Sequence, residues 1–180
     1  MITYSYVYRI ITALICLIFI LHMVYQHRGP AVIVLACALS VYAVEAIGTF
    51  LFPIVYDPHV MKTGPLKYNY IPFNSIAGYF SRFSAPAAWK QIFRKTLIFL
   101  PVGLLPPLIS EKYRYKKELF PLIFITSLCI EMAQFAECMI TQIPYRVIDI
   151  DDIILNFIGG VLGYLLFLLI RTVSRFVSER

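Results

Sequence analysis

Long apolar stretches dominate this chain and leave little sequence between them. Of its 180 residues, 60% are hydrophobic and only 14% are charged, whereas a water-soluble domain has about 25% charged residues. Because a membrane-spanning helix needs roughly 20 apolar residues, the length allows about five such helices. The sequence therefore predicts an all-α, polytopic membrane helix bundle. It excludes an ordinary soluble enzyme, a disordered tail and a coiled coil.

Proline, glycine and charged residues separate the apolar stretches. Gly29-Pro30 is a strong helix breaker that ends the first stretch. Pro101 interrupts the third stretch, and an interrupted helix leaves backbone groups that need partners, so we expect it to pack inside the bundle. The predicted transmembrane helices cover residues 10–24, 31–56, 92–109, 119–140 and 153–170.

The segment 57–91, between the second and third predicted helices, has no spanning pattern. It is rich in Tyr, Phe, Pro and Ser and poor in charge. Because aromatic rings favour the headgroup zone of a bilayer, we expect an interfacial or re-entrant segment there.

The basic residues predict the orientation of the chain. Its net charge is +6, but Lys and Arg lie in loops and at helix ends. They are therefore interpreted as anchors beside anionic membrane lipid, and no nucleic-acid partner is expected. Lys and Arg divide evenly between the two sides, but those in the loop 111–118 and after residue 170 lie in short, basic connections. The positive-inside rule then places the N-terminus outside and the C-terminus in the cytoplasm.

The cysteines and histidines do not form a recognisable metal or redox motif. The four cysteines lie inside apolar stretches, show no CxxC spacing and stand apart from the histidines. We therefore expect no disulfide framework, no metal site and no cofactor.

Polar side chains interrupt the fourth apolar stretch on one helical face. Ser127, Glu131, Gln134 and Cys138 follow the spacing i, i+4, i+7 and i+11. A carboxylate at the centre of a transmembrane helix costs about 2.5–3.5 kcal/mol on insertion scales, so the presence of Glu131 requires an explanation. It is either part of a functional site or one member of a structural interhelical hydrogen-bond pair with Gln134.

The segment 146–164 holds the densest group of polar residues. On a helix that begins near Asp149, polar and small residues fall on one face. Gly159 and Gly163 have the GxxxG spacing that lets helices approach closely. The simpler alternative is that the acidic groups cap the helix and the glycines pack it. Asp149, Asp152, Asn156, Gly160 and Gly163 share this face.

Together, these segments predict one polar cluster between the fourth and fifth transmembrane helices. Antiparallel packing would place Gln134 nearest Asn156, and Glu131 deeper, opposite Gly159 and Gly160. The chain contains no GxSxG or HExxH motif and no phosphate-binding glycine loop, so no catalytic residue is assigned. The cluster consists of Glu131, Gln134, Arg146, Asp149, Asp152 and Asn156, with Arg94 and Lys95 as further counter-charges.

Four motifs in this order resemble the VanZ-like family of bacterial membrane proteins. Asn69-Tyr-Ile-Pro-Phe comes first, and Phe99-Leu-Pro-Val-Gly is similar to the family's FxPxG helix. Ser127-x-x-x-Glu131-x-x-Gln134 and the segment 146–163, which resembles R-x-x-D-x-x-D-x-x-x-N-x-x-G, follow. The chain departs from the family where many members carry Asn before the FxPxG helix, since it has Arg94-Lys95 there.

The resemblance implies a division of the chain and a function. Residues 1–30 would be an additional N-terminal transmembrane helix, residues 31–171 the VanZ-like membrane domain, and residues 172–180 a short basic cytoplasmic tail. The implied function, in a bacterial cell membrane, is lower susceptibility to teicoplanin-type glycopeptide and lipoglycopeptide antibiotics. The partner would be a lipophilic glycopeptide or a lipid-linked cell-wall precursor that meets the polar cluster.

Two other functions stay open at this stage. In an intramembrane enzyme acting on a lipid-linked substrate, Asp149, Asp152 and Glu131 would be acid, base or metal ligands. In a small cation- or proton-coupled transporter, Glu45 and Glu131 would carry the ion. Five helices without an inverted repeat give no complete alternating-access pathway, so a transporter would require a homo-oligomer, for example through Gly159 and Gly163.

Overall fold

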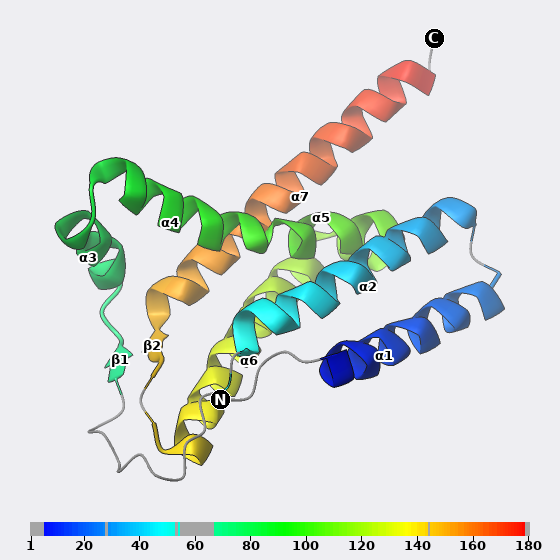
Figure 1. The fold of residues 1–180 in the computed structure, drawn as a ribbon. Coiled ribbons are helices and arrows are strands. Elements are labelled where there is room, and N and C mark those ends of the chain that lie inside the picture. The colour runs from blue at the N-terminus through cyan, green and yellow to red at the C-terminus, as the bar shows by residue number, and fades with distance from the viewer. Residues whose placement is uncertain (1–5, 28, 53, 55–66, 144, 179–180) are drawn as a thin grey trace. The chain divides into compact units, whose positions relative to one another are not determined.

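Helices make up nearly all of the regular structure (Figure 1). The structure is a computed structural model that describes residues 6–27, 29–52, 54, 67–143 and 145–178. Its elements are α1 (Tyr6–Tyr25), α2 (Pro30–Leu51), β1 (Lys67–Asn69), α3 (Asn74–Arg82), α4 (Ala85–Ile98), α5 (Leu100–Ile109), the 3-10 helix η1 (Glu111–Arg114), α6 (Lys116–Thr141), β2 (Val147–Asp149) and α7 (Ile150–Ser178).

Four helical segments are long and apolar enough to cross a membrane. They are Pro30–Leu51, Ala85–Ile109, Lys116–Thr141 and Ile150–Phe176. The apolar helix Arg9–Tyr25 is shorter, and it corresponds to the first of the five predicted spans. The prediction of an all-α membrane bundle is therefore confirmed.

Prolines set several of the helix boundaries. Pro30 begins α2, where its missing N–H has no intrahelical partner to lose. The helix ends before Phe52, whose backbone is extended, as is typical of a residue that precedes a proline. The break between α4 and α5 falls at Phe99, two residues before Pro101. Because proline lacks an N–H and crowds the preceding turn, it explains the interruption of this span.

The chain divides into two compact units. The first unit comprises residues 1–74 and 128–150, and the second comprises residues 75–127 and 151–180. In the first unit, α1 and α2 form an antiparallel hairpin (Figure 1). The second unit holds α3 from Ser75 on, α4, α5, η1, the N-terminal half of α6 and α7.

Two short parallel strands, β1 and β2, join distant parts of the first unit. Tyr68 pairs with Ile148, and Asn69 pairs with Asp149. These strands were not predicted, because three residues are too few to show the alternation that identifies a strand. Residues 57–66 of the predicted interfacial segment lie outside the described residues. The rest of that segment forms β1, the short helix α3 and the beginning of α4.

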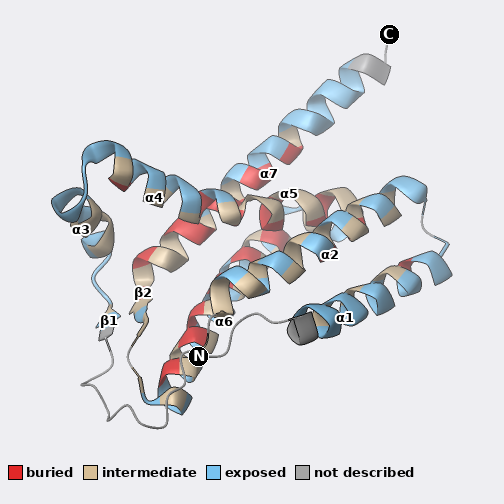
Figure 2. Ribbon diagram, in the orientation of Figure 1, coloured by how far each residue is buried: buried red, intermediate tan, exposed pale blue. Residues whose placement is uncertain are grey.

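Burial differs sharply between helices (Figure 2). In the second unit, Phe99, Leu119 and Ile123 are fully buried and form the core. Along α1, by contrast, large apolar side chains such as Ile15 and Ile18 are exposed. Exposed apolar surface on a membrane-spanning bundle faces lipid at no cost, because lipid tails are as apolar as the side chains.

Candidate functional site

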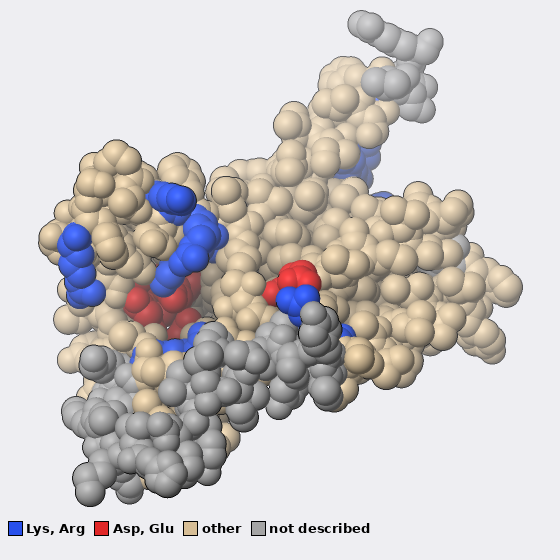
Figure 3. Space-filling model, in the orientation of Figure 1, with Lys and Arg blue, Asp and Glu red and all other residues tan. Residues whose placement is uncertain are grey.

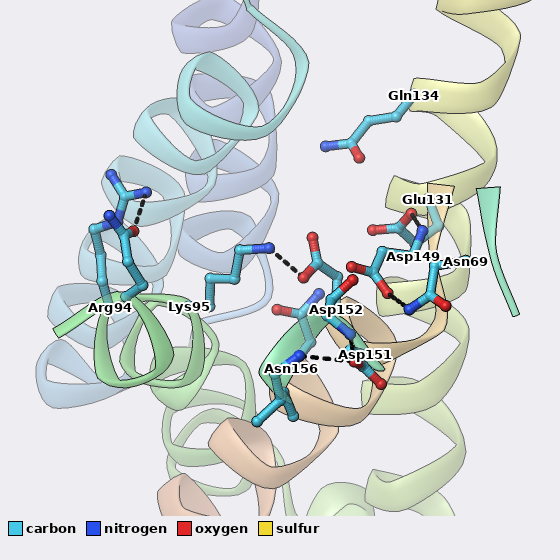
Figure 4. A network of polar contacts seen from close by, with 12 residues as sticks. Asn69, Arg94, Lys95, Glu131, Gln134, Asp149, Asp151, Asp152 and Asn156 are labelled. Atoms are coloured by element: carbon cyan, nitrogen blue, oxygen red, sulfur yellow. Dashed lines mark hydrogen bonds and ion pairs between the residues drawn. The ribbon is translucent and has the colours of Figure 1, made fainter. Parts of the chain in front are cut away.

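The first unit buries a carboxylate against a strand. Glu131 on α6 is 3% exposed, and its Oε2 accepts a hydrogen bond from the backbone N–H of Asp149 at 3.2 Å. The Asp149 side chain in turn accepts a bond from Asn69 Nδ2 at 2.9 Å (Figure 4). Burying an ionisable group is costly unless donors surround it. The β1–β2 pairing therefore supplies these donors. We call Asn69, Glu131 and Asp149 the Glu131 cluster.

Asn69 is held in place from both sides. Its Oδ1 accepts a bond from the backbone N–H of Ile71 at 3.2 Å and another from Asn74 Nδ2 at 3.2 Å. The first of these is the local side-chain-to-backbone bond that favours asparagine in turns. These bonds occupy Oδ1, and the strand register places the Nδ2 amide group beside Asp149.

Two other predicted site residues bind the end of α2. The carbonyl oxygen of Phe50 accepts bonds from Gln134 Nε2 at 2.7 Å and from Arg146 Nη1 at 2.6 Å. The last four carbonyls of a helix have no intrahelical partner, and a cation there also complements the helix dipole. Gln134 and Arg146 therefore cap α2.

Glu137 forms a second acidic contact in the first unit. Its Oε2 accepts a bond from the Tyr145 hydroxyl at 3.0 Å and lies 3.5 Å from Arg146 Nε. Burial raises the pKa of the Tyr145 phenol above its ordinary value. The phenol therefore stays protonated at neutral pH and remains a donor to Glu137.

In the second unit, Asp151 caps a short helix. It is 1% exposed, and its Oδ2 accepts bonds from the backbone N–H groups of Ser75 at 2.8 Å and Ile76 at 3.1 Å. These N–H groups belong to the first turn of α3, where a helix has unpaired donors and a positive dipole end. Asp151 thus joins the start of α7 to the start of α3.

The next residue, Asp152, forms an ion pair with Lys95 of α4 (Figure 4). The Lys95 ammonium also lies 5.6 Å from the centre of the Tyr79 ring, within cation–π range. On the face that Figure 3 shows, Asp and Glu side chains lie next to Lys and Arg side chains. The counter-charge that the sequence suggested for Asp152 is therefore Lys95.

Asn156 connects α7 to α6 inside the second unit. Its Nδ2 donates to Ser127 Oγ at 3.0 Å, and both side chains are buried, with exposures of 3% and 0%. Both groups lie within segments that are apolar enough to span a membrane. Each side chain thus gives the other a hydrogen-bond partner at a depth where neither water nor lipid supplies one.

The glycines of α7 bring it into backbone contact with α4 and α5. A Cβ atom on Gly159 would lie 1.9 Å from the carbonyl oxygen of Thr96, and one on Gly163 would lie 2.1 Å from that of Leu100. A Cβ on Gly160 would meet the side chain of Ile123 at 2.5 Å. The GxxxG spacing is therefore used for packing within the chain.

The family model of VanZ/LLP1 matches residues 13–171. The chain belongs to the VanZ/LLP1 family. No curated protein and no solved structure matches it. Within this VanZ/LLP1 chain, the matched region contains every polar residue described above.

The structure divides the predicted polar cluster of this family member over the two units. Glu131, Gln134, Arg146 and Asp149 belong to the first unit, and Asp152 and Asn156 to the second. Two details of the expected geometry differ. Asn156 has Ser127 as its partner instead of Gln134, which binds Phe50. Glu131 accepts the Asp149 N–H in the first unit, and Gly159 and Gly160 pack against Thr96 and Ile123 in the second.

Several participants were not predicted from the sequence as site residues. From the sequence, Asp151 is one of the acidic groups expected to cap its own helix, and no predicted motif includes Glu137. Asn69 is the first residue of the Asn-Tyr-Ile-Pro-Phe motif, and its place in that motif is the sequence signal that points to it. Among the residues that the structure describes, no three His, Cys, Asp or Glu side chains gather as metal ligands do.

Proposed function

We propose that this VanZ/LLP1 membrane protein lowers susceptibility to teicoplanin-type glycopeptide and lipoglycopeptide antibiotics at the bacterial cell envelope. The family membership supports this proposal, because resistance to this drug class is what the VanZ-like pattern implies. The Glu131 cluster is the proposed functional site, with Gln134 and Arg146 holding the neighbouring end of α2.

The burial of Glu131 is the observation that carries the proposal. A carboxylate that is 3% exposed lies on a helix that is apolar enough to cross a membrane. Ionisable residues in such segments are expensive and usually serve a function. A purely structural role would be met at lower cost by apolar packing, since buried ionic groups contribute little net stability.

The chemistry of the cluster suits a ligand rich in amides and hydroxyls. Asn69, Glu131 and Asp149 present carboxylate and amide oxygens as acceptors and the asparagine amide as a donor. A glycopeptide carries peptide N–H groups and sugar hydroxyls, and a lipid-linked cell-wall precursor carries both as well. With the N-terminus outside, the C-terminal end of α6 and strand β2 lie at the outer surface, where these drugs act.

Expression in a susceptible Gram-positive host tests the proposal. We expect the inhibitory concentration of teicoplanin to rise more than that of vancomycin, because the teicoplanin acyl chain keeps the drug at the membrane. An empty vector and a strain with matched membrane levels of the Glu131→Gln variant serve as controls. If the protein reaches the membrane and shifts neither teicoplanin nor any lipoglycopeptide, the proposal is wrong.

The Asp149→Asn variant separates binding from catalysis at the same site. It keeps the backbone N–H that Glu131 accepts and a side-chain oxygen for Asn69, but it removes the carboxylate. Acid–base catalysis would lose its proton carrier, whereas a binding site that uses the negative charge of Glu131 would keep that charge and most of its hydrogen bonds. Retained protection in Asp149→Asn cells supports binding. Complete loss with normal protein levels would favour an enzyme.

A further inference from the structure

A basic cavity lies in the second unit, away from the acidic residues at the start of α7. Its volume is about 420 Å³, and it lies among the end of α5, η1 and the last turns of α7. That volume is within the range of small-ligand pockets, which runs from about 300 to 1,000 Å³. Its lining includes three arginines, Arg114, Arg171 and Arg175, which we call the arginine rim.

The position of the cavity along α7 places it at a membrane surface. Arg171 follows Asp152 by 19 residues, which corresponds to about 29 Å of helix. The hydrocarbon core of a bilayer is about 30 Å thick. Asp152 and Arg171 are thus separated by about one membrane thickness, and the arginines lie at headgroup level on the side opposite Asp152.

Arg114 is fixed in the wall of the cavity. Its Nη1 donates to Glu111 Oε1 at 2.8 Å and its Nε donates to the carbonyl of Pro107 at 3.4 Å. Its own backbone carbonyl accepts a bond from the Tyr164 hydroxyl at 3.1 Å. Glu111 balances one positive charge, so Arg171 and Arg175 leave the rim with a net positive charge.

The rest of the lining is mostly apolar. Leu108, Phe167 and Ile170 belong to it, and Ile170 is 40% exposed. Arginines together with an apolar wall of Leu108, Phe167 and Ile170 match a phospholipid, because guanidinium groups bind phosphate oxygens while apolar side chains contact an acyl chain. Free phosphate would use the rim alone and leave the apolar wall without a partner.

We propose that this cavity binds one anionic phospholipid, with its phosphate on Arg171 and Arg175 and an acyl chain along Phe167 and Ile170. The predicted orientation places the site in the cytoplasmic leaflet, where anionic lipid is drawn to basic residues beside transmembrane helices. The site is independent of the Glu131 cluster and of the proposed antibiotic function.

Lipid titration of the purified full chain tests the proposal. Delipidated protein in detergent is titrated with phosphatidylglycerol or phosphatidylcholine of identical acyl chains, and native mass spectrometry measures the first bound lipid. We expect phosphatidylglycerol to bind more tightly. The Arg171→Gln/Arg175→Gln variant should lose roughly fivefold in affinity for each arginine removed, or about 25-fold in total. The control Arg82→Gln/Lys90→Gln removes the same charge from exposed positions of the second unit outside the cavity and should bind as the unchanged protein does.

A charge-conserving variant covers the case in which the arginine variant does not fold. Ser174 also lines the cavity, so Ser174→Trp should fill it and weaken phosphatidylglycerol binding with all arginines present. Equal binding of phosphatidylcholine, or an equal loss in the Arg82/Lys90 control, would show nonspecific attraction and overturn the proposal. Displacement of the lipid by inorganic phosphate from the unchanged protein would instead assign the rim to free phosphate and also overturn it.

Discussion

The carboxylates at the start of α7 and those of the Glu131 cluster have different kinds of partners. In the second unit, Asp151 binds the first turn of α3 and Asp152 binds Lys95, so each carboxylate meets a positive helix end or a cation. In the first unit, Glu137 lies 3.5 Å from Arg146, but the two carboxylates of the Glu131 cluster accept hydrogen bonds from neutral donors, the Asp149 backbone N–H and the Asn69 amide. Helix ends and cations satisfy a carboxylate more fully than neutral donors do.

This difference assigns different roles to the units. The second unit combines compensated charges with glycines whose backbones touch neighbouring helices, which is the construction of a rigid scaffold. The first unit binds Glu131 and Asp149 through neutral donors of the paired strands β1 and β2. Substitutions in the second unit should therefore act on folding, and substitutions in the Glu131 cluster should act on function.

The largest effect should follow from Gly159→Ala in the second unit. The added Cβ would lie 1.9 Å from the Thr96 carbonyl oxygen, a backbone atom that cannot turn away. Separating α7 from α4 should cost about 3 kcal/mol, measured as a lower melting temperature in detergent. The control is Gly29→Ala, since nothing lies within 4 Å of that Cβ position. A Gly159→Ala protein as stable as the control would contradict the claim that close packing of α7 makes the second unit rigid.

Asp151→Ala should have a smaller effect. It leaves the N–H groups of Ser75 and Ile76 without the carboxylate that binds them, at a cost of about 1–2 kcal/mol. Hydrogen exchange at these two amides should become faster, while Asp151→Asn, which keeps an acceptor oxygen, should protect them better than alanine. Unchanged exchange in Asp151→Ala would mean that α3 has another cap.

The smallest effect should come from Tyr145→Phe in the first unit. It removes the single hydroxyl bond to Glu137, worth about 1 kcal/mol. The control is Tyr115→Phe, because Tyr115 is 63% exposed. A loss of stability as large as that from Gly159→Ala would show that the first unit is as rigid as the second. It would contradict the difference in rigidity between the two units.

The helical spans could be predicted from the sequence because they follow local rules. The third span, predicted over 92–109, is part of Ala85–Ile109, and the predicted fourth span lies within Lys116–Thr141. Composition and helix breakers act over a few residues, so a single sequence reveals them. The helical face that contains Ser127, Glu131 and Gln134 follows from the same periodicity.

The partners of these side chains could not be predicted in the same way. Helical spacing shows which residues share a face, but it does not show how far one helix slides along another. Asn156 therefore meets Ser127 instead of Gln134. The contact between Asn69 and Asp149 joins residues 80 positions apart through strands of three residues, and neither strand has a recognisable pattern.

The separation of function from scaffold is tested most directly by comparing Glu131→Gln with Glu118→Gln in one teicoplanin-susceptible host. Both variants remove one negative charge from α6, but Glu131 is buried against Asp149, whereas Glu118 lies in the first turn and is only half-buried. With membrane levels matched, the teicoplanin inhibitory concentration should fall to that of the empty vector for Glu131→Gln. It should stay at that of the unchanged protein for Glu118→Gln. Full protection by Glu131→Gln would contradict a functional role for the Glu131 cluster.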